Sequence, residues 1–235
     1  MSFTNFITQL GAAGAGGGFD PDTPIGTAIA GGYFAGIIVQ GGDQYAIIVS
    51  PKASGQSSSL AFKTSNTASP TATQTLNYGS AATEAMVSAG SHPAAAFCAG
   101  LTIDGYSDWY LPARDELEVC YRNLKGTSAG VNSTITRDKS TITYPEGNDS
   151  SGDGMGVNRN SSPIGAAYTT SSPAQTSVTI FQQTQSQAFD TEPYHCSTEF
   201  SNTHSWVLDL NSGRCFTLFV KTQVLRVRAV RREPI

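Results

Sequence analysis

The apolar runs of this chain are short, and this limits the structures that it can form. The two longest, residues 36–39 and 45–49, have the length of β-strands, and neither approaches the ~18 apolar residues of a membrane-spanning helix. Between them lies Gln40-Gly-Gly-Asp43, and glycine readily adopts the positive φ angles of tight hairpin turns. The sequence therefore predicts a β-hairpin over residues 32–49 and no membrane insertion.

Three helices are predicted in the middle of the chain. Residues 81–89 are rich in helix formers, and Pro93 suits the first turn of a second helix that ends at Gly100. The third begins near Pro112 and ends at Gly126. It carries one apolar stripe, which we expect to face the core, and its members are Leu117, Cys120, Tyr121 and Leu124.

Alternating apolar residues predict strands near the end of the chain. Trp206, Leu208 and Leu210 alternate with other residues and lead into the turn Asn211-Ser-Gly213, which a further apolar run follows. This pattern indicates a second hairpin. In a last strand, residues 225–229, apolar residues alternate with arginines, so one face packs and the other is expected to present guanidinium groups.

The basic residues do not indicate nucleic-acid binding. Five of the 14 lie between Lys221 and Arg232, but the net charge is −4 and no aromatic residues are interleaved with them. Pairing of these cations with acidic residues is the simpler interpretation, and the expected partners are Glu116, Glu199 and Asp209.

The first ten residues contain a short amphipathic pattern. Phe3, Phe6, Ile7 and Leu10 have the i, i+3, i+4, i+7 spacing of one helix face, and residues 11–18 then include five glycines. So short a helix is stable only when docked. It docks either on its own domain or on another protein, as an anchor on a flexible tether. The basic and apolar regions of a signal peptide are not present here.

Metal binding and disulfide formation have weak sequence support. Residues 147–160 are rich in Asp and Asn, but their spacing does not match a calcium loop, so a solvated turn cluster is favoured. Late in the chain, four residues of zinc-ligand type lack the short spacing of a zinc site: His195, Cys196, His204 and Cys215. Reduced, buried thiols are the expectation for all four cysteines, with a Cys196–Cys215 disulfide as the alternative.

Four sequence blocks carry a family resemblance. They are GYSDWYLPARDEL at residues 105–117, YHCSTE at 194–199, SWVLDLNSG at 205–213 and VLRVRAVRR at 224–232. In this order they resemble the Lcl C-terminal domain family over about residues 78–232. Family members usually read Tyr-Trp-Ser-Ser-Thr-Glu in the second block, so His195 and Cys196 are departures that affect local packing.

The resemblance implies a fold and a setting. Its members form tips of collagen-like adhesins and parts of phage tail and fibre proteins, with a fold similar to C-type lectins and formylglycine-generating enzymes. We therefore expect an α+β chain in three parts: an anchor helix and Gly-rich tether at 1–24, a β-hairpin attachment region at 25–77, and a C-type-lectin-like domain at 78–235. Residues of the blocks are expected to form the scaffold, namely Asp108, Trp109, Leu111, Pro112, Glu116, Leu117, Ser197, Thr198, Glu199, Trp206, Arg226 and Arg228.

The function expected from the resemblance is binding. No nucleophile elbow, phosphate loop with lysine or zinc-protease motif occurs, so neither an enzyme nor a cofactor is expected. As a fibre tip, the protein would bind a host cell-surface glycan or protein through late loop residues, which are Tyr194, His195, Phe200, Asn202 and His204. The alternative is a capsid or tail decoration protein without a receptor.

Both functions place the protein on the virion surface after synthesis in the host cytoplasm. In both, Phe3, Phe6, Ile7 and Leu10 would contact other virion proteins. The resemblance also implies a homo-oligomer, with a trimer as the expected state.

Overall fold

The computed structural model describes residues 18–128 and 157–235. The expected anchor residues Phe3, Phe6, Ile7 and Leu10 lie outside the described residues, as does most of the Asp/Asn-rich segment 147–160. The described part is an α+β structure with two five-stranded sheets. None of its helices is long and apolar enough to cross a membrane.

The first sheet contains the predicted hairpin. Its order is β1–β2–β3–β10, and β5 pairs with β2. The strands are β1 (Ala28–Ile29), β2 (Gly32–Gln40), β3 (Asp43–Val49), β5 (Ser161–Ser162) and β10 (Val230–Pro234). Gly41 and Gly42 turn the chain between β2 and β3 with φ angles of +63° and +101°, which confirms the hairpin and the role of its glycines.

The second sheet contains the late strands. Its order is β4–β9–β6–β7–β8, and only the β6–β9 pairing is parallel. The strands are β4 (Gln56–Ala61), β6 (Pro193–Glu199), β7 (Ser205–Asp209), β8 (Cys215–Phe216) and β9 (Val224–Arg228). Antiparallel pairing of β7 with β8 confirms the second predicted hairpin.

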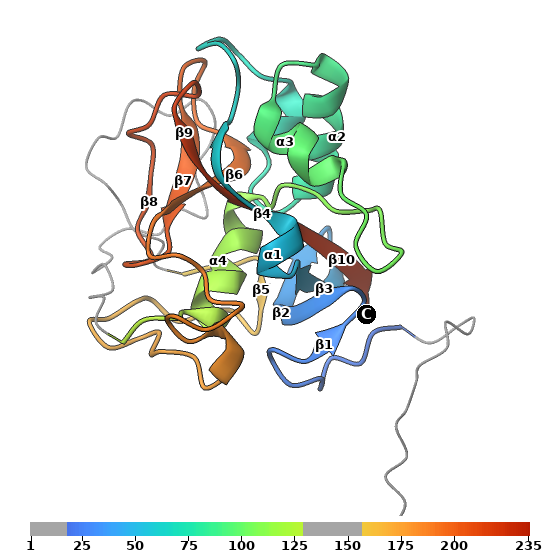
Figure 1. Ribbon diagram of the computed structural model, residues 1–235, viewed down its shortest axis with the longest axis vertical. Helices are drawn as coiled ribbons and strands as arrows, with labels where there is room; N and C mark the ends of the chain where they lie inside the picture. The colour runs from blue at the N-terminus through green and yellow to red at the C-terminus, as the bar shows by residue number, and fades with distance from the viewer. Residues whose placement is uncertain (1–17, 129–156) are drawn as a thin grey trace, which may run out of the picture.

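The three predicted helices are confirmed. They are α2 (Gly79–Ala89), α3 (Pro93–Ala99) and α4 (Arg114–Leu124), and a single turn, α1 (Lys52–Gly55), and two 3-10 turns, η1 (Thr71–Gln74) and η2 (Thr179–Phe181), complete the described set. In Figure 1, α2 and α3 pack together at one end of the molecule. Helix α4 contacts β2 and β3 of the first sheet and β6 and β7 of the second, so it joins the two sheets.

The hairpin shares its core with the later part of the chain. One apolar cluster joins Ile38 and Ile47 to the buried stripe of α4, and a second joins Phe34 and Ile48 to Trp109. Strand β10 pairs with β3 from Val230 opposite Val49 onward. Residues 25–77 and 78–235 are therefore packed into one another.

The expectation of reduced, buried thiols is confirmed. All four cysteines are free and buried, and β7 lies between the strands of Cys196 and Cys215, so the alternative Cys196–Cys215 disulfide is wrong. The predicted last strand is β9, and a separate strand, β10, follows Ala229, so β9 enters the second sheet and β10 the first.

Arg228 is buried and does not present its guanidinium to solvent. It donates to the carbonyl oxygens of Ser50 (2.8 and 3.0 Å) and Gln187 (2.8 Å), and its guanidinium lies 4.7 Å from the ring centre of Phe189. Carbonyl dipoles and the aromatic face thus replace water around the charge. Burial still lowers the pKa of Arg228 to about 10.

Candidate ligand-binding loop

The turn that connects β6 to β7, residues 200–204, is closed by its own hydrogen bonds. The carbonyl oxygen of His204 accepts from the backbone N–H groups of Phe200 and Ser201, each at 3.1 Å. The Ser201 hydroxyl oxygen accepts from the backbone N–H groups of Thr203 (3.4 Å) and His204 (3.2 Å), and Thr203 Oγ1 lies 2.8 Å from His204 Nδ1. These hydrogen bonds fix the backbone of the turn, and so they fix the positions from which its side chains project.

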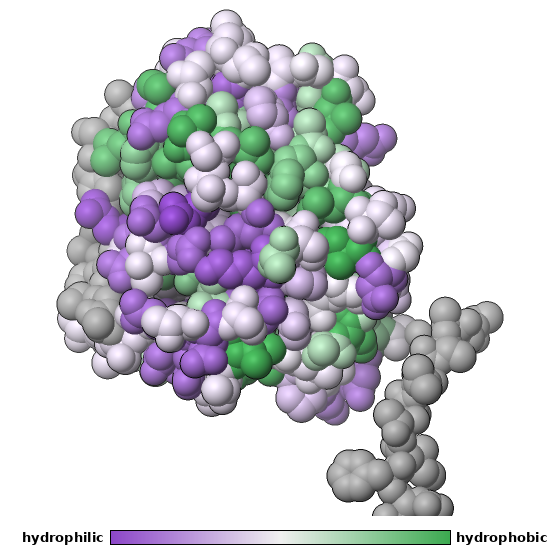
Figure 2. Space-filling model, in the orientation of Figure 1, coloured by the Kyte–Doolittle hydropathy of each residue, from purple (hydrophilic) through white to green (hydrophobic). Residues whose placement is uncertain are grey.

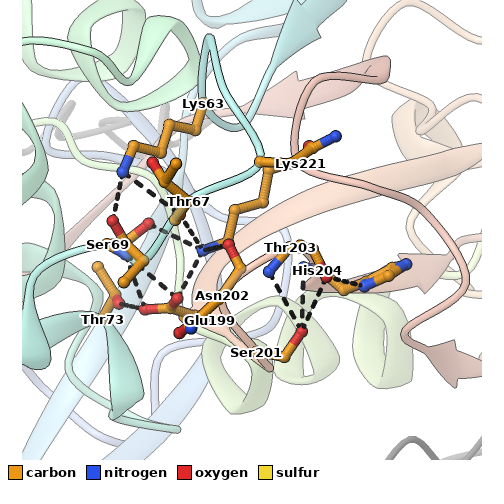
Figure 3. A network of polar contacts seen from close by, with 12 residues as sticks. Lys63, Thr67, Ser69, Thr73, Glu199, Ser201, Asn202, Thr203, His204 and Lys221 are labelled. Atoms are coloured by element: carbon orange, nitrogen blue, oxygen red, sulfur yellow. Dashed lines mark hydrogen bonds and ion pairs between the residues drawn. The ribbon is translucent and has the colours of Figure 1, made fainter.

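Lys221 binds this turn, as Figure 3 shows. Its backbone N–H donates to the carbonyl oxygen of Thr203 (2.9 Å), and its Nζ donates to that of Asn202 (3.0 Å). The same Nζ lies 2.5 Å from Glu199 Oε1, and the lysine side chain is fully buried. One buried cation thus connects the turn to the end of β6.

Glu199 is satisfied by donors from a distant segment. Its carboxylate accepts from the backbone N–H of Ser69 (3.2 Å) and from the Thr73 hydroxyl (3.0 Å), besides Lys221. Burial lowers the pKa of Lys221, while the hydrogen bond and charge of Glu199 oppose that shift. Removing either partner would leave the other charge buried without its counter-ion.

A second lysine and a histidine lie beside this ion pair. Lys63 Nζ donates to the carbonyl oxygens of Thr67 and Ala68, and His92 Nε2 lies 3.1 Å from the Ser69 hydroxyl. Burial, followed by the charge of Lys63, lowers the pKa of His92 to about 4, so this ring is neutral at pH 7. We call Lys63, Ser69, His92, Glu199 and Lys221 the loop anchor.

Only part of the predicted binding set is available to a ligand. Asn202 is exposed and His204 half-buried, and both lie on the turn. The loop position expected for Tyr194 and His195 is wrong, because both are buried in β6. Phe200 follows β6 but is also buried, with its ring centre 5.4 Å from that of Trp206.

The two buried β6 residues have hydrogen bonds within the fold. The Tyr194 hydroxyl donates to Gln56 Oε1 and accepts from the backbone N–H of Asp190, both at 3.0 Å. His195 Nε2 lies 3.1 Å from the carbonyl oxygen of Gln223. Burial lowers the pKa of His195 to about 4.

The first sequence block forms contacts that fix α4 and the chain before it. Asp108 accepts two hydrogen bonds from Arg231 (2.7 and 2.9 Å), and the Trp109 indole donates to the carbonyl oxygen of Tyr106 (3.0 Å). The Glu116 carboxylate accepts from the backbone N–H of Ala113 (2.7 Å), which caps the helix. Leu111, Pro112 and Leu117 are buried.

The second block ties β6 to the start of α4. The backbone N–H of Ser197 donates to the carbonyl oxygen of Pro112 (2.8 Å), and Thr198 Oγ1 accepts from the backbone N–H of Arg114 (3.0 Å). Trp206 of the third block lies under the Arg114 guanidinium, 5.1 Å from the ring centre. These positions hold the base from which the turn projects.

One predicted acidic partner is confirmed for the basic residues near the end of the chain. Glu199 pairs with Lys221, as expected. Arg226 pairs instead with Asp190 at 2.8 Å, and Arg231 pairs with Asp108. Sequence reasoning missed Asp190 because nothing in its local sequence distinguishes it from other loop acids.

Sequence reasoning also missed the part of the loop anchor that comes from residues 54–80. This polar stretch supplies Lys63 and Ser69 of the loop anchor, and also Thr73, which donates to Glu199. Ser69 and Thr73 bind Glu199, more than a hundred residues later in the chain, so no local spacing pattern marks them. Lys63 donates to the nearby carbonyl oxygens of Thr67 and Ala68.

Comparisons with family models, curated proteins and solved structures found no match to this chain. Within residues 18–128 and 157–235, no group of three or more His, Cys, Asp or Glu side chains could hold a metal ion. What the turn offers is an amide, a hydroxyl and an imidazole on a fixed backbone. Such groups recognise polar surfaces through hydrogen bonds.

Proposed function

We propose that this chain is a structural protein of a bacteriophage virion, in a tail fibre or fibre tip, that binds the host surface without catalysing a reaction. Residues 200–204 form the contact loop, and Asn202 and His204 are its ligand-binding side chains. The observation that carries the proposal is the buried Lys221–Glu199 pair, which holds an exposed polar turn on a fixed base.

Rigidity supports binding because a loop that is already ordered loses less conformational entropy when it binds a ligand. Few charges and many Ser, Thr, Asn and Gly residues also suit a recognition surface, because these side chains form adaptable hydrogen bonds. The four ordered sequence blocks support a domain of the Lcl C-terminal type with a C-type-lectin-like fold. The α+β architecture agrees with that fold class.

Adsorption competition tests the proposal. Purified full-length protein is added to susceptible cells before infectious particles, and binding of labelled protein is scored on the same cells. We expect the protein to bind and to reduce adsorption, and Asn202→Ala with His204→Ala to weaken both effects. A folded, correctly assembled sample that does not bind cells would favour the decoration role.

The anchoring role of residues 3–10 has its own test. We expect a chain without residues 1–18 to fold, because the deletion removes only the expected anchor helix and its Gly-rich tether, and to be lost from assembled particles. Normal incorporation of this shortened chain would contradict the anchor. Sedimentation of both forms would show whether the same segment is needed for the homo-oligomer, expected to be a trimer.

A further inference from the structure

A polar hollow lies away from the loop anchor, beside α1 and the loop before β6. Its volume is about 350 Å³, and its lining residues are Lys52, Gln183, Thr184, Gln185, Ala188, Phe189, Asp190, Thr191, Glu192 and Arg226. Figure 2 shows a hydrophilic area in the middle of the face that carries α1. Pockets that bind small molecules start at about this size.

The floor of the hollow is preorganised around Asp190. This carboxylate accepts from Lys52 Nζ (2.6 Å), Gln56 Nε2 (2.9 Å) and Arg226 Nε (2.8 Å). The hydroxyl of buried Tyr194 donates to Gln56 and accepts from the backbone N–H of Asp190. The donors and acceptors of the floor are thus held by α1, β4, β6 and β9 rather than by a single loop.

Hydrogen-bonding groups remain unused on the ligand side. Among the described residues, Arg226 forms its hydrogen bond through Nε, to Asp190. Its Nη1 forms an ion pair with Glu192 Oε2 at 3.8 Å, which is too long for a hydrogen bond. The exposed side chains of Gln183 and Gln185 make no hydrogen bond within the described part of the chain. One hollow is therefore lined by two amide groups and by a guanidinium and a carboxylate that have hydrogen-bonding capacity left.

The charges of the hollow balance. Lys52 and Arg226 carry two positive charges, and Asp190 and Glu192 carry two negative ones, so neither an anion nor a cation is favoured by net charge. A metal ion is disfavoured because the Asp190 oxygens already bind three donors. An alcohol hydroxyl both donates and accepts, so it can join a carboxylate to a guanidinium.

We propose that this hollow binds a neutral sugar, with its hydroxyl groups between Arg226, Glu192 and the exposed glutamines. The buried residues Ala188 and Phe189 supply the small apolar part of the lining. The backbone of Thr184 at the rim has a φ of +73°, which is rare for a β-branched residue and commonest at functional sites. The inference rests on the proposed function, and the hollow would be a second contact with the host surface, for a glycan, besides the contact loop at residues 200–204.

The test is a titration of the full chain with single sugars followed by ligand-observed NMR. The neutral probes are glucose, galactose, mannose and N-acetylglucosamine, and the charged probes are glucuronic acid and glucosamine. We expect at least one neutral probe to bind with a Kd of about 1 mM, and the charged probes to bind more weakly. No neutral binding at ~100 mM, or tighter binding of a charged probe, would overturn the proposal.

Variants locate the site. Asp190→Asn keeps the side-chain shape but removes the charge that orients Lys52 and Arg226, and we expect it to weaken sugar binding about tenfold. Gln185→Ala changes only an exposed rim group, so it tests the site even when Asp190→Asn affects folding. Ser88→Ala, an exposed position on α2 outside both proposed contact sites, is the matched control and should leave the Kd unchanged. Equal binding by all three variants would place the sugar elsewhere.

The two proposals can fail separately. If the protein binds a sugar but does not block adsorption, the sugar site is supported and the receptor-binding function is contradicted. If the protein blocks adsorption but binds no sugar, the receptor-binding function is supported and the sugar site is contradicted.

Discussion

Lys221 has two structural roles at once. Its backbone N–H and Nζ hold the turn at residues 202–203, and its charge neutralises Glu199 in a region without water access. The sequence predicted that Glu199 would pair with a cation in this region. It did not predict that the lysine would also hold the loop, because backbone acceptors leave no signature in the amino-acid pattern.

Replacing Lys221 by Met should destabilise the protein strongly. Glu199 would keep its buried position without a counter-ion, and we expect the free energy of unfolding to fall by about 3 to 5 kcal/mol. Urea unfolding measures this loss. Lys52→Met is the matched control, because its pair with Asp190 is about a third exposed and should cost less than about 1 kcal/mol. Equal losses of unfolding free energy in the two variants would show that burial does not make the Lys221–Glu199 pair more important for stability.

Stability should decrease in mild acid because of His92. Its pKa is lowered by burial and by Lys63 to about 4 in the folded protein, from 6.5 in the unfolded chain. The unfolded chain therefore binds this proton first, and the stability present above pH 6.5 is lost as the pH falls toward 4. Urea unfolding at pH 7 and pH 4.5 should show a smaller drop for His92→Gln than for the unchanged protein. Asn202→Ala should keep the full drop, and an identical drop in His92→Gln would contradict the assignment.

At the scale of single elements, a helix or hairpin was predictable when the residues that determine it lie within the element itself. The glycines at 41–42 fixed the first turn, and the apolar stripe placed α4 within two residues of its start. Burial of Arg228 and the division of the last strand at Ala229 were not predictable. Both depend on partners, such as Ser50 and Gln187, that lie far from Arg228 in the sequence.

The start of α2 depends on a residue without a side chain. A Cβ at Gly79 would overlap Glu116 Oε2 and lie 2.7 Å from the carbonyl oxygen of Leu111. We expect Gly79→Ala to cost about 3 kcal/mol, since backbone atoms block the space and the Glu116 cap must move. Gly90→Ala at the other end of α2 meets open space and should cost only about 1 kcal/mol, for its left-handed backbone. Thermal unfolding compares the two, and a smaller loss at Gly79 would contradict this account.

At the scale of the whole molecule, the first hairpin joins the two apolar clusters. Phe34 and Ile48 pack in the cluster of Trp109, while Ile38 and Ile47 pack in the cluster of α4. The sequence suggested a hairpin region followed by a separate domain, because the family resemblance begins only at about residue 78. Pairing of β3 with β10 connects these parts across almost the whole chain.

Shared packing predicts a single unfolding transition. Trp206 lies in the cluster of α4, and Trp109 lies in the other cluster. Fluorescence of Trp206→Phe therefore reports on the Trp109 cluster, and fluorescence of Trp109→Phe reports on the α4 cluster. Within each variant, fluorescence and far-UV circular dichroism should give the same urea midpoint. A fluorescence midpoint that differs from the dichroism midpoint in either variant would show that the clusters unfold separately.

The described chain begins and ends at the same place. The backbone N–H of Phe19 donates to the carbonyl oxygen of Pro234, and Gly18 lies against Ile235. A circular permutant can therefore join residue 235 to residue 18 by a short linker and open at Gly41–Gly42, where no other atoms are close. Native circular dichroism from such a chain would show that the fold depends on which strands meet and not on the order in which they are synthesised.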